Sequence, residues 1–119
     1  MGEIWDKVTV KGNKIGKEMD AFFDTGATYN HIDEDVAKEV GIIMLNKVLK
    51  SAISDGSMID SELGVGFVTI KGCKIPAFFS VKKKGAVPLT IGHVTMQAVK
   101  AKIDLEHDGV KITCPAEYQ

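Results

Sequence analysis

The sequence predicts an all-β fold, and three observations support that class. Apolar and polar residues alternate along several short segments, which is the period of a strand with one buried face. Turn-forming pairs such as Gly12-Asn13 and Asp55-Gly56 separate these segments. Stretches with helical character are few and short. A chain of 119 residues is long enough for one core, so residues 1–119 are predicted to form a single domain with one or two short helices.

The first third of the chain is predicted to form a hairpin, a loop and a short helix. Residues 4–10 alternate, and residues 15–23 return after the Gly12-Asn13 turn, so two antiparallel strands are expected. The helix is expected over residues 33–41. Its acidic first turn suits the helix dipole, and Gly41 can end it.

The rest of the chain continues with strands joined by turns. Residues 48–70 predict two strands joined at Ser54-Asp55-Gly56, because Asp-Gly readily adopts the positive φ values of a tight hairpin turn. Within the second strand, Gly64-Val65-Gly66 lacks the third glycine, the lysine and the following helix of a phosphate-binding loop, and a strand kink is predicted instead. The remaining predicted elements are a hairpin over residues 68–81, a strand over residues 86–91 and a short helix over residues 94–99.

The charge pattern argues against nucleic acid as a partner, and the lack of long apolar segments argues against membranes. The chain has 15 lysines, no arginine and 16 acidic residues, and arginine is the residue best suited to phosphates and guanine edges. The dense basic run Lys82-Lys83-Lys84 is interpreted as a solvated turn. Residues 1–7 contain too few apolar residues for a signal peptide, and no later segment is apolar enough to span a bilayer, so a cytoplasmic location is predicted.

No metal or other cofactor is predicted. Cys73 and Cys114 do not form a metal-binding spacing, and two free thiols are expected in a reducing compartment rather than a disulfide. No pair among the three histidines has the spacing of metal ligands. His31 is interpreted as a partly buried polar group, His93 as a helix-start residue and His107 as a turn residue.

Asp24 is the candidate catalytic residue. It ends an apolar strand and is followed at once by a loop of small residues, Thr25-Gly26-Ala27-Thr28. Aspartate is poor in strand interiors, and glycine lets the chain turn sharply with its backbone N–H groups aimed at a neighbouring side chain. A carboxylate placed in this way is either tightly hydrogen-bonded or catalytic. The simpler alternative is a loop aspartate that caps its own backbone.

The residues around Asp24 resemble a known family. The run from Phe23 to Ile32 resembles the active-site segment of retropepsin-like aspartic proteases, in which an apolar residue precedes Asp-Thr/Ser-Gly-Ala. The segment Pro88 to His93 is similar to the later apolar-apolar-Gly segment, with Ile91 and Gly92 as supporting residues behind the active-site loop. The other matching segments are residues 101–105 and 109–112, which resemble the closing strands, and residues 53–59, which resemble the flap.

The resemblance implies a retropepsin-like closed β-barrel that forms one half of an acid protease. It also implies an aspartic endopeptidase that binds peptide or protein substrates. The chain holds a single copy of the Asp-Thr-Gly loop, so the second catalytic aspartate would come from another copy of the chain in a homodimer. By resemblance, Thr25 would bond across the dimer axis, Gly26 N–H would orient the Asp24 carboxylate, and Ala27 would line the cleft. The implied flap residues are Ser54, Asp55, Gly56 and Ser57.

The sequence departs from the viral members at two positions. Those members usually place Asp after the Asp-Thr-Gly-Ala run and Arg after the later Gly, and the two form an ion pair near the dimer interface. Here the positions hold Thr28 and His93, so both partners of that pair are missing together.

Two other functions are weighed against the protease. The first keeps the fold without the chemistry, as a catalytically inactive retropepsin-like dimerisation or peptide-binding module. The second is a phosphoryl-transfer enzyme, which needs a second acidic metal ligand close to the first. Gly26 occupies the position where that ligand typically lies, and the hairpins do not suit the parallel α/β arrangement of such enzymes.

Overall fold

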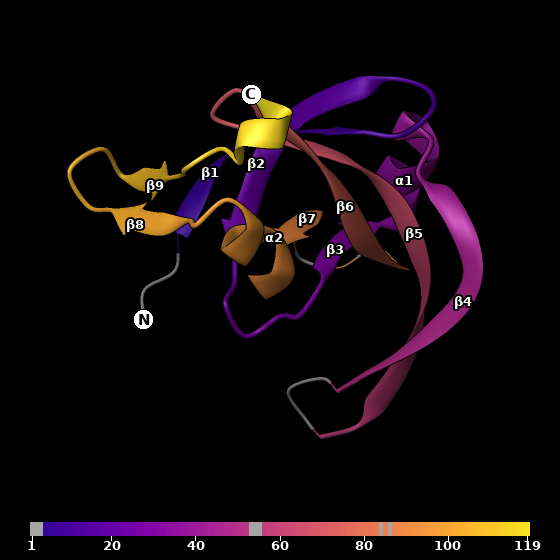
Figure 1. Ribbon diagram of the computed structural model, residues 1–119. Helices are drawn as coiled ribbons and strands as arrows, with labels where there is room; N and C mark the ends of the chain where they lie inside the picture. The colour runs from indigo at the N-terminus through magenta and orange to yellow at the C-terminus, as the bar shows by residue number, and fades with distance from the viewer. Residues whose placement is uncertain (1–3, 53–55, 84, 86) are drawn as a thin grey trace.

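The computed structural model describes residues 4–52, 56–83, 85 and 87–119 (Figure 1). In chain order its elements are β1 (Ile4–Lys11), β2 (Gly16–Phe23), β3 (Asn30–Asp33), α1 (Glu34–Val40), β4 (Ile43–Ala52), β5 (Met58–Ile70), β6 (Cys73–Lys82), β7 (Leu89–Ile91), α2 (His93–Ala98), β8 (Lys102–Asp104), β9 (Gly109–Lys111) and the 3₁₀ turn η1 (Ala116–Tyr118). The predicted all-β class with short helices is confirmed.

Six strands close into a barrel. The order β1-β2-β7-β3-β6-β5 returns to its start because β1 also pairs with β5, while β4 pairs with β5 from outside the ring. The short strand β7 pairs in parallel with β2 and antiparallel with β3. Closure leaves no unpaired edge within the ring, and it confirms the predicted closed barrel.

The core follows the alternation of the strands. Along β6, Cys73, Ile75, Ala77 and Phe79 are buried and the residues between them are exposed. The same pattern places Val8 and Val10 of β1 inside the barrel. α1 begins with acidic residues and ends at Gly41, whose φ of 82° belongs to the left-handed region, as the sequence predicted.

The strands β4 and β5 form a long hairpin that extends beyond the barrel, toward the bottom of the view in Figure 1. β4 begins at Ile43, earlier than predicted, because its first residues pair with the middle of β5 before the register shifts between Met44 and Val48. Of the predicted flap residues, Ser54 and Asp55 lie outside the described residues. Gly56 and Ser57 are described, and both are exposed just before β5.

At Gly64–Gly66, where a strand kink was predicted, the register of β5 with β6 continues unbroken, whereas the register of β4 with β5 shifts beside Gly64. The space around the two glycines gives a further reason for them. A Cβ atom at Gly64 would lie 2.5 Å from the Ile42 side chain, and one at Gly66 would lie 2.8 Å from the Lys11 carbonyl oxygen. The two glycines therefore let the neighbouring chain approach closely.

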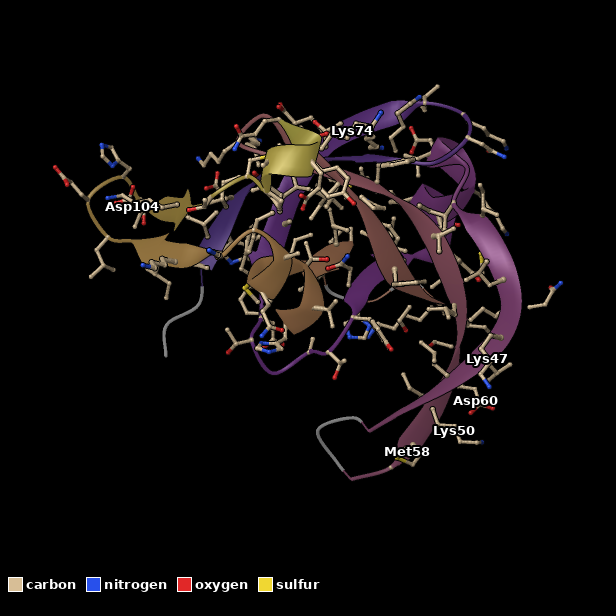
Figure 2. All side chains as sticks on the ribbon, viewed as in Figure 1. Lys47, Lys50, Met58, Asp60, Lys74 and Asp104 are labelled. Carbon is tan, nitrogen blue, oxygen red and sulfur yellow. A yellow bond between two sulfur atoms is a disulfide. The ribbon has the colours of Figure 1, made fainter. Side chains whose placement is uncertain are left out.

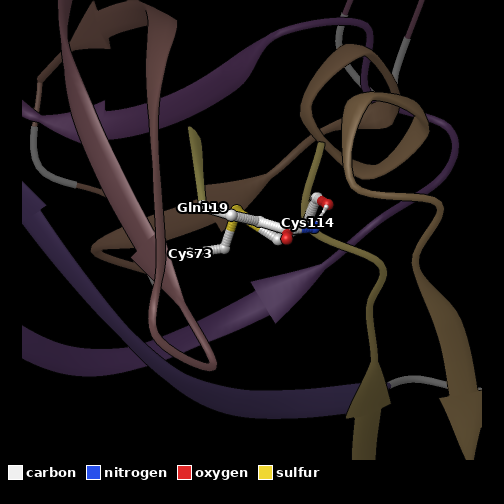
Figure 3. Close-up of a disulfide and its surroundings, with 3 residues drawn as sticks. All are labelled: Cys73, Cys114 and Gln119. Atoms are coloured by element: carbon white, nitrogen blue, oxygen red, sulfur yellow. Dashed lines mark hydrogen bonds between the residues drawn. A yellow bond between two sulfur atoms is a disulfide. The ribbon is translucent and has the colours of Figure 1, made fainter. Parts of the chain in front are cut away.

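The prediction of two free thiols is wrong, because Cys73 and Cys114 form a disulfide with their Cα atoms 5.6 Å apart (Figure 3). It joins the first residue of β6 to the chain that follows β9. That chain is drawn back to the barrel by a hydrogen bond from Thr113 N to the Val99 carbonyl, and the Gln119 amide donates to the Cys114 carbonyl. A separation of 41 residues in sequence gave no sign of this proximity.

Replacing both cysteines with serine is expected to destabilise the protein by about 3 to 4 kcal/mol, because the bond closes a long loop and so restricts the unfolded chain. Urea unfolding of the wild type and of the Cys73→Ser/Cys114→Ser variant measures this difference. A reducing agent should lower the midpoint of the wild type and leave that of the variant unchanged. Equal midpoints for the oxidised wild type and the variant would contradict the prediction.

Helices in the described part of the chain are all too short or too polar to cross a membrane.

Candidate active site

Asp24 lies where β2 leaves the barrel, and backbone hydrogen bonds fix its position. Its N–H donates to the Ile91 carbonyl at 3.0 Å, which extends the pairing of β2 with β7 by one residue. The Gly26 N–H donates to Asp24 Oδ1 at 2.9 Å, and the Ala27 N–H donates to the Asp24 carbonyl at 3.2 Å. The loop thus aims one N–H group at the carboxylate, as the sequence predicted for Gly26.

The start of α2 holds the other end of this loop. His93 N–H donates to the Ala27 carbonyl at 2.6 Å, and Val94 N–H donates to the Thr28 carbonyl at 3.0 Å. These bonds join the two segments that contain the sequence departures Thr28 and His93. Backbone hydrogen bonds therefore connect the predicted active-site loop to the start of α2 at Thr28 and His93.

Gly92 is required by the space available. A Cβ atom there would lie 2.4 Å from the Tyr29 carbonyl oxygen and 2.9 Å from that of Ala27. Neither backbone atom can move without displacing the loop. The structure therefore places the predicted supporting residues Ile91 and Gly92 directly against the segment that carries Asp24.

Asn30 is a supporting residue that sequence reasoning missed. Its side chain is 1% exposed and makes three hydrogen bonds. Its amide donates to the Phe78 carbonyl at 3.1 Å and to Thr95 Oγ1 at 2.9 Å, and its Oδ1 accepts from Gly92 N–H at 2.9 Å. Asn30 thus ties β3 to β6 and to α2 behind the loop. A polar amide within an apolar segment was the available signal.

A cavity of about 480 Å³ opens beside Asp24. Its lining comes from the loop and β3, from the β4–β5 hairpin, and from the end of β6. The lining residues are Asp24, Gly26, Ala27, Thr28, Tyr29, His31, Leu49, Lys50, Ile59, Ser80 and Lys82. The hairpin therefore covers the same cavity into which the predicted active-site loop faces, and Asp24 is the sole acidic residue among the described residues of the lining.

Lys82 corrects the interpretation of the lysine run as a solvated turn. It is the last residue of β6, it is partly buried, and it lines the cavity, whereas Lys83 is exposed. The strand continues further than the sequence suggested, because β6 pairs with β3 through Lys82. Lys84 lies outside the described residues.

His31 is partly buried, as predicted, but it also lines the cavity. Burial lowers the pKa of its imidazole, and the nearby positive charge of Lys82 lowers it further, while the Asp24 carboxylate acts in the opposite direction. Its Nδ1 atom is buried and has no hydrogen-bond partner among the described residues. Burial and the charge of Lys82 therefore both favour the neutral form of the ring.

A second cavity of about 350 Å³ lies on the other side of the active-site loop, and it is mostly apolar. Its lining residues are Ile4, Phe23, Thr25, Met96, Ala101, Lys102, Ile103 and Val110. Asp24 and Thr25 are consecutive, yet they line different cavities. Thr25 is thus placed apart from the cleft and beside the small sheet formed by β8 and β9.

The turn between β8 and β9 is held by Asp104, whose carboxylate accepts hydrogen bonds from the backbone and the imidazole of His107, the latter at 2.8 Å. Among the described residues, Asp104, Glu106 and His107 form the one group whose possible metal-ligand atoms lie within 4.8 Å of one another. The hydrogen bonds between Asp104 and His107 close a turn, and this explains why the three side chains lie together. His107 is thus a turn residue, as interpreted from the sequence.

No protein-family model matches the chain, and no curated protein matches it. Solved structures do match. The retroviral protease-like domain of Ddi1 from Leishmania major is 22% identical with a TM-score of 0.65, over 94% of this chain and 89% of that one. EIAV protease in complex with the inhibitor HBY-793 is 14% identical with a TM-score of 0.67, over 87% of this chain and 94% of that one. At these identities the likeness shows the fold.

Proposed function

Starting from the retropepsin-like fold that the chain adopts, we propose that it is an aspartic endopeptidase, active as a homodimer in which each copy supplies Asp24. One observation carries the proposal. A single carboxylate, oriented by the Gly26 N–H group, lies in a cavity that the β4–β5 hairpin covers. This is the arrangement that peptide hydrolysis requires from one half of an acid protease.

The chemistry needs two carboxylates. One takes a proton from the attacking water while the other, which is protonated, donates to the oxygen of the scissile carbonyl. Two carboxylates about 3 Å apart cannot both ionise, so the pair shares one proton and loses its two protons in well-separated steps. Because the described lining offers no second acid, the partner carboxylate would be Asp24 of a second copy.

The apolar cavity beside Thr25 supports this dimer. Two exposed apolar side chains lie next to it, Ile103 on β8 at 40% exposure and Leu105 in the turn after β8 at 89%. Apolar groups in this setting are stabilised by burial against a partner. We assign this surface to the second copy, with Thr25 next to its counterpart across the twofold axis and the two Asp24 side chains facing each other.

The β4–β5 hairpin would act as the flap. Leu49, Lys50 and Ile59 lie on its two strands and line the cavity opposite the active-site loop. A substrate would bind in extended form between the hairpin and the loop, adding a strand. Closing the hairpin over the peptide would exclude bulk water and strengthen the electrostatic interactions inside.

The experiment that tests the function is incubation of the purified protein with a diverse peptide pool, followed by mass spectrometry of the products. Cleavage at internal peptide bonds is expected, with inhibition by a pepstatin-like transition-state mimic and no effect of a metal chelator. An intact pool after incubation with a dimeric protein would favour the non-cleaving binding module instead.

The sequence and the disulfide point to different cellular compartments. Cytoplasmic residence remains a prediction, whereas the Cys73–Cys114 disulfide is typical of proteins in oxidising compartments. Counting free thiols in protein taken directly from its native cells decides between the two. Two thiols per chain would support the cytosol, and none would support an oxidising compartment.

A further inference from the structure

We propose that the cleft selects peptides with an acidic side chain close to the scissile bond, and that Lys82 binds this side chain with His31 beside it. The inference rests on the proposed function, because it assigns the substrate class of the same cavity.

The charges that line the cavity carry the argument. Its described lining contains two lysines and one aspartate. Lys50 already has a partner, since its ammonium lies 3.3 Å from Asp60 on the facing strand of the hairpin (Figure 2). Lys82 has no ion-pair partner among the described residues. Its neighbour in the β3–β6 register, Asp33, is buried and accepts a hydrogen bond from Gly85 N–H instead.

His31 and Lys82 line the same cavity and lie on the paired strands β3 and β6. Besides burial, the positive charge of Lys82 is what lowers the pKa of this ring. A buried ring nitrogen without a partner is uncommon in folded proteins, and His31 Nδ1 is one. A neutral imidazole has one N–H donor and one acceptor nitrogen. The Lys82 ammonium would therefore supply the positive charge for a bound carboxylate, and the His31 ring could add one hydrogen bond.

The proposed dimer leaves an excess of positive charge in the cleft. Two Asp24 carboxylates that share a proton carry one negative charge, while Lys82 of both copies supplies two positive charges that no described residue pairs. Charge complementarity of this kind contributes mainly to specificity. Since a twofold dimer presents Lys82 twice, the acidic preference is expected at equivalent positions on both sides of the scissile bond.

The experiment uses matched peptides that differ only by Glu, Gln or Lys at one position, moved along each side of the cleaved bond. The expected kcat/KM for the best-placed Glu is about tenfold above that for Gln, with Lys lowest. Lys82→Met should make kcat/KM equal for the Glu and Gln peptides. Lys82→Glu should make the Lys peptide the best substrate and the Glu peptide the worst. His31→Gln should reduce the ratio of kcat/KM between the Glu and Gln peptides. Lys83→Met is the matched control, because Lys83 is the exposed neighbour outside the cavity lining, and it should keep the wild-type order.

Binding of the same peptides to Asp24→Asn protein, measured by fluorescence anisotropy, separates this inference from the proposed function. Cleavage without a charge preference would overturn the inference and leave the peptidase in place. An equal loss of preference in Lys82→Met and Lys83→Met would also overturn it. If the wild-type protein leaves the peptide pool uncleaved, but Glu peptides bind more tightly than Gln peptides and Lys82→Glu reverses that preference, the inference is supported and the peptidase is contradicted. Binding that ignores charge would overturn the inference whether or not cleavage occurs.

Discussion

Peptide cleavage is expected to fall by about 10³-fold or more when Asp24 is replaced by asparagine, because the amide can neither accept the proton of the attacking water nor share one with its counterpart. The substitution keeps the shape of the side chain, and its Oδ1 atom can still accept the hydrogen bond from Gly26 N–H. The loop and the dimer should therefore persist. Initial rates on a cleaved peptide, together with light scattering of the same samples, measure both quantities.

Asp20→Asn provides the matched control for that substitution. Asp20 lies on β2, four residues before Asp24, and its exposed carboxylate pairs with Lys7 at 3.0 Å on the protein surface. Solvent screens an exposed pair of this kind, so its loss should change stability little and activity should stay near that of the wild type. Equal rates for Asp24→Asn and Asp20→Asn would exclude Asp24 from the chemistry.

The second large effect is expected for Ile103→Asp, which should weaken dimerisation by about 100-fold and reduce activity in parallel. Ile103 lines the apolar cavity beside Thr25, and in a twofold dimer the new carboxylate would be buried in both copies. Sedimentation velocity over a range of concentrations gives the dimer dissociation constant. Activity measured across the same range should recover as the concentration rises.

Ile15→Asp is the control for this surface. Ile15 is exposed to a similar extent, 49% against 40% for Ile103, but it lies between β1 and β2 next to Lys14, whose N–H donates to Val40 at the end of α1. Circular dichroism should show an unchanged fold for both variants. A dimer that tolerates Ile103→Asp as well as Ile15→Asp would place the interface elsewhere.

The elements that sequence reasoning predicted correctly are those with a local signal. Alternation located β1, β2 and β6, and Gly41 located the end of α1, because each depends on residues close together in the chain. The position of Asp24 between two buried segments is also local. The closed barrel was expected from the resemblance to retropepsin-like proteases, because local patterns place strands along the chain without giving their order in the sheet.

The features that were missed depend on contacts between distant segments. Cys73 and Cys114 meet because the barrel closes and the chain after β9 returns to it. Asn30 binds groups on β6 and α2 that lie 48 to 65 residues away in sequence. Lys82 appeared to belong to a charged turn, and its place in the cavity follows from pairing of β6 with β3. Apart from the polar amide of Asn30 within an apolar segment, these contacts leave no pattern in neighbouring residues.

Mixing of subunits tests most directly whether two chains build one active site. Wild-type protein at a concentration well above its dissociation constant is combined with an equal amount of Asp24→Asn protein, and exchange is followed by energy transfer between labelled copies. Random pairing should reduce the activity of the wild-type protein to about half, because each mixed dimer holds a single Asp24 carboxylate. Activity that stays unchanged after complete exchange would show that one chain suffices, and would contradict the shared site.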